Sequence, residues 1–532
     1  MLRPLAPRRL ALALGGIVLA VGLYVLLEAA SVHAFVPNSD GATVVLEGKA
    51  LLGGNLLLRH WNISLDSFWL VDVLWYAVAV ALVGLKAVLL HAVPAAIAAV
   101  AIVVGVAMAL EERRGAAAVA AGGTVIAILA FPSQALAQFL LRGPLHVGTA
   151  LWALVAFLGL RRGRYGWGWV VAVVFFAAGM LSDLLILAFG VVPAALAGVT
   201  AALRTRDWRR SLPLVSAAVV SGVLAEAGRV TLRAIGTFKI ASANPISSPH
   251  QMLLDVRHGL HEAVLMLGVG SSYYGLGGEP TALSYVHLVA VLLVAVAVAG
   301  SVLAIVWGSL RGRLTVVGPS SEQAFRLDDM LLFATLASGA VFVMLATVPD
   351  PQYARYLTSG IVFGAILTAR MVGRIASVVS SRLLGGALAA AGLVVAGCFA
   401  AGVAFDIAQP APVTSASDLV GFLESHHLLH GVGAYWSASI VTVESGGKVQ
   451  VRPVVVPFGH EIRQYDRNSS RTWYRHGTGD FLVYEPGAPW GGVDRQNAVD
   501  TFGPAARSYN VYGYEVLVWN KQLVVPANPG TR

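Results

Sequence analysis

One carboxylate in this sequence is placed where it can act on a molecule held at a membrane surface. Asp40 stands in the segment Pro37-Asn38-Ser39-Asp40-Gly41, directly after the first long apolar stretch. A carboxylate that emerges at the membrane–water boundary stays ionised close to the lipid headgroups, and an ionised carboxylate can accept a proton. The simpler interpretation is a turn, because Asp followed by Gly is a common turn pair. The choice between them depends on what else the chain places at the same membrane face.

Other ionisable and aromatic residues stand at the ends of later apolar blocks. An arginine there can bind a phosphate through two N–H groups, a histidine can exchange a proton near neutral pH, and a tyrosine can stack on a sugar ring. The simpler interpretation is that such side chains only reach water or headgroups, or that Asp183 caps the next helix. The candidates for a binding site are His60, His91, Arg142, His146, Asp183, Arg257, His258, Tyr353, Arg355 and Tyr356.

The composition indicates a polytopic α-helical membrane protein. Of the 532 residues, 57% are hydrophobic and 12% are charged, the mean hydropathy is +0.73, and the apolar residues come in blocks. The net charge of +9 comes largely from arginines between the blocks, which indicates contact with membrane lipids rather than nucleic acid. The single cysteine, Cys398, lies in an apolar run, so no intramolecular disulfide and no cysteine metal site is expected.

Arginine clusters between the apolar blocks predict how the chain crosses the membrane, because positive charge marks the cytoplasmic side. If every arginine cluster lies on the cytoplasmic side, the apolar blocks correspond to about eleven membrane crossings. The C-terminal residues then lie outside the cytoplasm. The stretch Ser67 to Gly84 fits a helix lying in the outer interface, within one outer loop of residues 33–87. The clusters lie at Arg113-Arg114, 161–164, 204–210, 311–313 and 370–382. The blocks are 10–31, 88–110, 115–131, 145–160, 166–182, 184–203, 211–229, 283–307, 329–348, 354–372 and 384–404.

The character of the sequence changes at the stretch 409–412, where apolar blocks end and short β-like runs follow. This change predicts a membrane-spanning catalytic region of residues 1–405 and an extracytoplasmic α/β domain of residues 406–532. Three aromatic residues of the second region fit the core of a small sheet or, alternatively, a carbohydrate-binding surface. They are Tyr435, Trp436 and Trp473.

A single outer carboxylate with several arginines fits sugar transfer from a polyprenyl-phosphate donor to a glycan or glycolipid of the cell envelope. The donor tail stays in the bilayer, its phosphosugar lies at the surface, and one base takes the proton of the acceptor hydroxyl. Because phosphate leaves as a stable anion, arginine replaces the second carboxyl that a glycosidase needs. The arginines and tyrosines available are Arg142, Arg257, Arg355, Tyr353 and Tyr356. No Asp-x-Asp pair accompanies Asp40, so neither a metal site nor a cofactor is predicted.

The sequence resembles the GT-C superfamily of membrane glycosyltransferases, which contains protein O-mannosyltransferases, the lipid A aminoarabinose transferases and actinobacterial envelope transferases. The similarity rests on Asp40 after the first span, on the long first outer loop with its embedded helix, and on three short motifs. The motifs are Gly143-Pro144-Leu145-His146, Ser182-Asp183 and Gln352-Tyr353-Ala354-Arg355-Tyr356-Leu357. The tail segments 433–438 and 445–449 resemble actinobacterial members.

The resemblance implies an inverting transferase of a bacterial plasma membrane, with its active site and C-terminal domain outside the cytoplasm. It implies that Asp40 is the general base and that Arg355 binds the donor phosphate. The sequence departs from the superfamily in two ways. Protein O-mannosyltransferases carry an Asp-Glu pair where only Asp40 stands here, and the paired acidic motifs of metal-dependent oligosaccharyltransferases are missing. A protein-hydroxyl acceptor and a metal requirement are therefore not expected.

Two other classes of protein stay open. A transporter or flippase of lipid-linked envelope precursors would also be polytopic, but it predicts ionisable residues near mid-bilayer and inverted repeats of broken helices. The sequence shows no such repeat, and Glu226 is the main ionisable residue that stands out within the predicted spans. An envelope scaffold or sensor would explain an external C-terminal domain, but it would not need an acid in the first loop together with arginines and histidines on the same face.

Overall fold

The computed structural model describes residues 7–64, 66–111, 113–240, 246–270, 281–311, 319–346, 350–379, 382–457, 459, 461–475, 478–488 and 491–528. Contacts between Cα atoms divide the chain into two compact units. We call the first the helical unit; it comprises Met1–Phe35, Pro94–Arg229 and Asn244–Ala411. The second, the mixed unit, comprises Val36–Val93, Val230–Ala243 and Pro412–Arg532. Each unit therefore gathers segments that lie far apart in the sequence.

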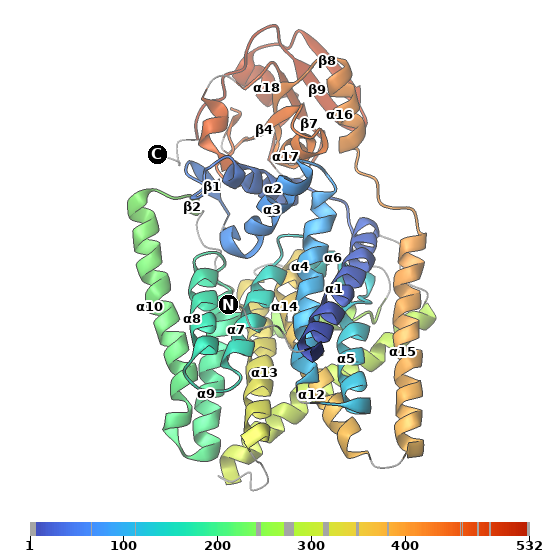
Figure 1. The fold of residues 1–532 in the computed structure, drawn as a ribbon. Coiled ribbons are helices and arrows are strands. Elements are labelled where there is room, and N and C mark those ends of the chain that lie inside the picture. Colours follow the sequence, from blue (N-terminus) through green and yellow to red (C-terminus); the bar gives the residue numbers. More distant parts are fainter. Residues whose placement is uncertain are drawn as a thin grey trace. The chain divides into compact units, whose positions relative to one another are not determined.

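Long apolar helices make up most of the helical unit; many of them run in similar directions in Figure 1, while α12 crosses them obliquely. Within it, α13 packs against α14 and α9, and α14 packs against α5. The helices are α1 (Pro7–Ala34), α4 (Leu89–Leu110), α5 (Gly115–Leu129), α6 (Gln134–Leu140), α7 (Val147–Leu160), α8 (Trp167–Met180), η2 (Leu187–Val191), α9 (Val192–Thr205), η3 (Trp208–Arg210), α10 (Leu212–Ile235), α11 (Pro249–Met266), α12 (Thr281–Arg311), α13 (Pro319–Leu345), η4 (Pro351–Ala354), α14 (Arg355–Val378) and α15 (Arg382–Ala408). The first turn of α4 and the last turn of α10 belong to the mixed unit.

The helices confirm the predicted class of polytopic helical membrane protein. Among the described residues, eight helices are long and apolar enough to cross a bilayer, and α5 with α6, bent by 87°, would make a ninth span. Each of the predicted apolar blocks contains a helix, but α7 and α8 have only 14 residues each. Such a helix is about 21 Å long, shorter than a hydrocarbon core of roughly 30 Å. The structure thus supports eight to nine crossings by length, fewer than predicted, and the orientation stays a prediction.

Helices α13 and α14 approach each other closely at a small-residue contact. A Cβ atom added to Gly360 would lie 2.7 Å from the Cβ of Ser338. The Ser338 hydroxyl donates a hydrogen bond to the carbonyl of Tyr356 and accepts one from the Gly360 N–H at 3.0 Å. Small residues and hydroxyl bonds are the usual means by which membrane helices associate. This contact fixes the first turns of α14, where two candidate residues lie.

Two arginines that were predicted to act only as cytoplasmic charge are buried in ion pairs. Arg204 makes two hydrogen bonds to Asp329, of 2.6 and 3.0 Å. Arg370 lies 2.5 Å from Asp328 and also donates to the carbonyl of Met108 at 2.6 Å. Neither aspartate was predicted as a partner, so the interpretation of these arginines as topological signals alone is wrong. Ion pairing of this kind compensates the cost of burying the charges.

The mixed unit combines the first loop with the C-terminal residues (Figure 1). The first loop contributes α2 (Ser39–Leu52), β1 (Trp61–Ile63), η1 (Trp69–Val73) and α3 (Leu74–Val83), and the residues after α10 contribute β2 (Lys239–Ile240). The C-terminal elements are α16 (Ala416–Ser425), β3 (His430–Ala434), α17 (Tyr435–Glu444), β4 (Gln450–Val455), β5 (Arg463–Gln464), β6 (Ser469–Ser470), η5 (Arg471–Tyr474), β7 (Phe481–Tyr484), α18 (Arg495–Phe502), β8 (Arg507–Val511) and β9 (Tyr514–Val518).

Two sheets organise the mixed unit. A six-stranded sheet has the order β5-β4-β3-β7-β9-β8, and its core includes Val432, Leu482, Leu517 and Trp519. A three-stranded sheet has the order β2-β1-β6, in which β1 pairs with β2 in parallel and with β6 in antiparallel fashion. The small sheet therefore links three segments that are far apart in sequence. The structure thus joins the C-terminal residues to the first loop, while the predicted domain limits of 1–405 and 406–532 stay a prediction.

Candidate functional site

Asp40 lies in the first turn of a helix. The side chain of Asn38 caps α2 by accepting a hydrogen bond from the Gly41 N–H at 3.3 Å. Asp40 is the second residue of this helix and is half-buried. The turn interpretation of Asp40 and Gly41 is therefore wrong. A carboxylate in this position is stabilised by the unpaired N–H groups and the positive end of the helix dipole.

A tyrosine from the C-terminal residues holds one oxygen of this carboxylate. The phenol of Tyr435, at the start of α17, donates a hydrogen bond to Asp40 Oδ1. Asn468 fixes this phenol, because its Nδ2 donates to the Tyr435 oxygen at 3.0 Å while its Oδ1 accepts the Ser64 N–H at 3.0 Å. The ring of Tyr465 stacks on Tyr435 with 4.6 Å between centroids. Within the part of the chain that the structure describes, no group donates a hydrogen bond to Asp40 Oδ2, which leaves that oxygen available to a substrate.

The network around Asp40 consists of neutral donors. Burial, followed by the charge of Asp40, raises the pKa of the Tyr435 phenol well above its ordinary value. The same two causes raise the pKa of Tyr465 to about 12. Tyr435 therefore stays protonated near neutral pH and keeps donating to the carboxylate.

A second cluster lies in the helical unit around Asp183, which is fully buried. Its Oδ2 lies 2.7 Å from His146 Nδ1 and accepts a hydrogen bond from the Thr149 hydroxyl, while its Oδ1 accepts the Leu185 N–H at 2.9 Å. Burial alone would raise the pKa of the Asp183 carboxyl, but the charge of His146 and these hydrogen bonds lower it below its ordinary value. Asp183 thus makes the local backbone contact expected of a cap and also binds the histidine.

His146 connects this carboxylate to the start of α14. Its ring stacks on Tyr356 with 5.6 Å between centroids, and its carbonyl accepts a hydrogen bond from the Ser359 hydroxyl at 3.2 Å. Arg355 Nη2 donates to the Tyr356 phenol at 3.2 Å, and its guanidinium lies 5.0 Å from the centroid of that ring. The ring of Tyr353 lies 6.2 Å from that of Tyr356. We call His146, Asp183, Tyr353, Arg355 and Tyr356 the arginine cluster.

Three more candidates of the helical unit make other contacts. His258, on α11, contacts Glu262 at 3.2 Å and the ring of Phe342 at 5.8 Å, and the neighbouring Arg257 is exposed. Arg142 places its guanidinium 5.9 Å from the ring centroid of Phe35. None of these contacts joins Arg142, Arg257 or His258 to the arginine cluster.

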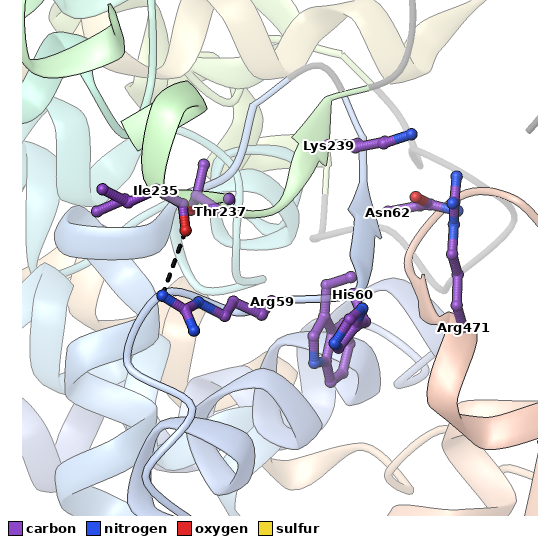
Figure 2. Close-up of a pocket in the computed structure, with 9 residues that line it drawn as sticks. Arg59, His60, Asn62, Ile235, Thr237, Lys239 and Arg471 are labelled. Atoms are coloured by element: carbon purple, nitrogen blue, oxygen red, sulfur yellow. Dashed lines mark hydrogen bonds between the residues drawn. The ribbon is translucent and has the colours of Figure 1, made fainter. Parts of the chain in front are cut away.

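Two further candidates, His60 and His91, belong to the mixed unit together with Asp40. His60 is exposed, has a left-handed backbone with φ of 68°, and lines a cavity with Arg59 (Figure 2). His91 is half-buried in the first turn of α4.

Several partners of the candidate residues were not predicted. Tyr435 was expected in a sheet core or on a sugar-binding surface, and its bond to Asp40 was not foreseen. Thr149 and Asn468 carried no signal in the sequence beyond being polar. Trp473 is half-buried and packs edge-on against Trp61 with 5.0 Å between centroids.

Comparisons with known proteins bring out a likeness in structure and none in sequence. No protein-family model and no curated protein matches the chain. Among solved structures, the chain is similar to the crystal structure of ArnT from Cupriavidus metallidurans in the apo state, with a TM-score of 0.42 and 13% sequence identity. The likeness covers 95% of this chain and 98% of that chain.

Proposed function

We propose that this integral membrane protein is a glycosyltransferase that moves a sugar from a polyprenyl-phosphate donor to a glycan or glycolipid of the cell envelope. The observation that carries the proposal is the half-buried Asp40 carboxylate, with one oxygen held by Tyr435 and the other free of donors among the described residues. A base needs this combination of fixed orientation and an available lone pair.

The proposed reaction is a single displacement. Asp40 Oδ2 takes the proton of the acceptor hydroxyl, and the acceptor oxygen attacks the anomeric carbon of the donor sugar. The bond from this carbon to the phosphate oxygen breaks, and polyprenyl phosphate leaves with the electron pair. Attack from the side opposite the leaving group inverts the anomeric centre.

The arginine cluster supplies the group that we propose for the leaving phosphate. Arg355 carries a permanent charge and a planar fork that can bind two phosphate oxygens. The ring of Tyr356 lies against the guanidinium, and His146 in turn stacks on Tyr356. The buried Asp183 fixes the His146 ring. The cluster therefore orients Arg355 from one side, which lowers the entropy lost when it binds a phosphate. Tyr353 offers a ring for the sugar.

One observation favours the transporter alternative. The pairs Arg204–Asp329 and Arg370–Asp328 are buried ionisable groups within or beside predicted spans, as a transporter requires. Each arginine is paired with a carboxylate, however, which fits a structural role equally well. The two functions differ in what they need, because transfer proceeds in detergent micelles, whereas transport needs two separated compartments.

The deciding experiment uses the purified protein in detergent with a radiolabelled polyprenyl-phosphate sugar and an envelope glycan fraction. We expect label in the glycan with wild-type protein and a loss of roughly 100- to 10,000-fold with Asp40→Asn, because the amide keeps the size but cannot accept the proton. Donor binding and thermal stability should be retained.

The matched control is Asp500→Asn, a change of an exposed acid on α18. Equal turnover by wild type and Asp40→Asn would exclude Asp40 as the base. Absence of any transfer, together with donor movement across proteoliposomes, would favour the transporter.

A further inference from the structure

A cavity of about 330 Å³ lies in the mixed unit where three chain segments meet (Figure 2). Residues 59–62 enter it from the turn before β1 and from β1 itself. Residues 235–237 and Lys239 enter it from the end of α10 and the start of β2, and Arg471 enters it from η5. Its volume falls within the range of small-molecule sites, roughly 300–1,000 Å³.

The lining of this cavity is positively charged. Arg59, Lys239 and Arg471 contribute three cations, and His60 contributes an imidazole. None of the described residues that line the cavity is acidic. Like charges gathered in one pocket repel each other, so an anion is the ligand that such a lining stabilises. We call this cavity the cationic pocket.

The backbone around the cationic pocket is tied together by hydrogen bonds. Arg59 Nη2 donates to the carbonyl of Ile235 at 3.2 Å, as Figure 2 shows, and the Arg471 N–H donates to the carbonyl of His60 at 2.9 Å. The strand pairing sets β1 beside β2, which carries Lys239. The three cations therefore come from elements that are held to one another before any ligand binds.

We propose that the cationic pocket binds the anionic group, a phosphate or a carboxylate, of the acceptor glycan. A guanidinium can bind such a group through two parallel N–H bonds, and an ammonium adds a point charge. The buried amide of Asn62 adds a polar group for a sugar hydroxyl. The identity of the ligand as acceptor rests on the proposed function, whereas the preference for an anion rests on the pocket alone.

The test measures binding without turnover, in phosphatidylcholine nanodiscs. Glucose 1-phosphate, glucuronate and glucose are titrated, with calorimetry as the readout. We expect saturable binding of the two anions, weakening with added salt, and none of glucose. Lys239→Gln and Arg471→Gln should each weaken binding about ten-fold, and Lys239→Arg should restore it. Arg507→Gln changes an exposed arginine of β8 outside the pocket and should leave binding unchanged.

Other outcomes overturn the proposal. Equal binding of glucose and the anions, or unchanged binding in both pocket variants at wild-type thermal stability, would show that the pocket is not an anion site. If the pocket variants lose retention of phosphatidylglycerol in native mass spectrometry but not the soluble anions, the pocket binds a lipid headgroup. If they lose binding of polyprenyl phosphate, it is a donor site. Anion binding in a protein that transfers no sugar would leave the pocket intact and refute the proposed function.

Discussion

The phenol of Tyr435 donates a hydrogen bond to the carboxylate of Asp40, although the two residues lie 395 positions apart in the sequence. Asn468 in turn donates to the phenol, so that the C-terminal residues supply two successive contacts that orient the proposed base. The C-terminal part of the mixed unit is therefore part of the proposed site.

Tyr435→Phe removes the donor to Asp40 and keeps the ring. A hydrogen bond to a charged group contributes about 1.5–3 kcal/mol, so we expect turnover to fall about ten-fold or more. The KM for the donor should stay unchanged. Steady-state kinetics measure both quantities, with Tyr512→Phe, at an exposed position, as control. Full turnover in Tyr435→Phe would contradict a role for Tyr435.

Arg355→Lys keeps the charge but loses the planar fork. We expect donor binding or turnover to weaken about ten-fold, at unchanged expression and thermal stability. A donor titration measures it, and Arg507→Lys, on an exposed residue of β8, is the matched control. If Arg355→Lys matches wild type throughout the titration, Arg257 or Arg142 becomes the better candidate for the phosphate.

Asp183→Asn removes the counter-charge of His146 inside the helical unit. Breaking a buried pair by changing one partner costs roughly 3–5 kcal/mol, so the melting temperature should fall. Because the pKa of Asp183 is lowered in the folded state, its contribution to stability is present above its ordinary pKa of 3.8 and is lost as pH falls through the folded value. The variant should therefore lose most stability at neutral pH. Equal melting curves at pH 7 would show that the pair is dispensable.

Glu47→Gln should remove a pH dependence of stability. Burial raises the pKa of Glu47 well above its ordinary value of 4.5, so the folded state binds this proton more tightly than the unfolded state. The contribution of Glu47 to the free energy of unfolding is fully present below the pKa that this group has in the unfolded state. The contribution is lost as pH rises through the pKa in the folded state. Wild type should thus lose stability relative to the variant as pH rises, which thermal unfolding at several pH values measures. Parallel curves would contradict the prediction.

The orientation of the membrane helices can be tested with single cysteines in a Cys398→Ser background. Leu56→Cys and Tyr512→Cys place thiols at exposed positions of the mixed unit, and Trp208→Cys places one at an exposed position between α9 and α10. We expect an impermeant thiol reagent added to intact cells to label the first two and not the third. Labelling of Trp208→Cys from outside would overturn the assignment of the arginine clusters to the cytoplasm.

The sequence was informative where the signal is local. Apolar blocks of sufficient length predict helices, and each predicted block contains one. Helix α2 was missed because residues 33–87 were interpreted as one outer loop with a helix only at Ser67 to Gly84, although Asn38 is a good cap and apolar residues follow it.

The contacts between distant segments had no such signal. The sequence predicted only that His146, Asp183, Arg355 and Tyr356 lie at the same membrane face. It did not predict their mutual contacts, because pairing between distant helices has no signature in one sequence. For the same reason, the ion pairs of Arg204 with Asp329 and of Arg370 with Asp328 were not predicted.

The strands of the three-stranded sheet are synthesised at widely separated times. Strand β1 is made early, but its partners β2 and β6 lie near residues 239 and 469, and Tyr435 follows Asp40 by 395 residues. At about 5–20 residues per second, roughly 20 to 80 s pass between synthesis of Asp40 and of Tyr435. During this interval the first loop has neither its strand partner from the C-terminal residues nor the donor to its carboxylate. A chain truncated before residue 435 thus carries the base without the contact that orients it, and completion of the chain becomes a condition for activity.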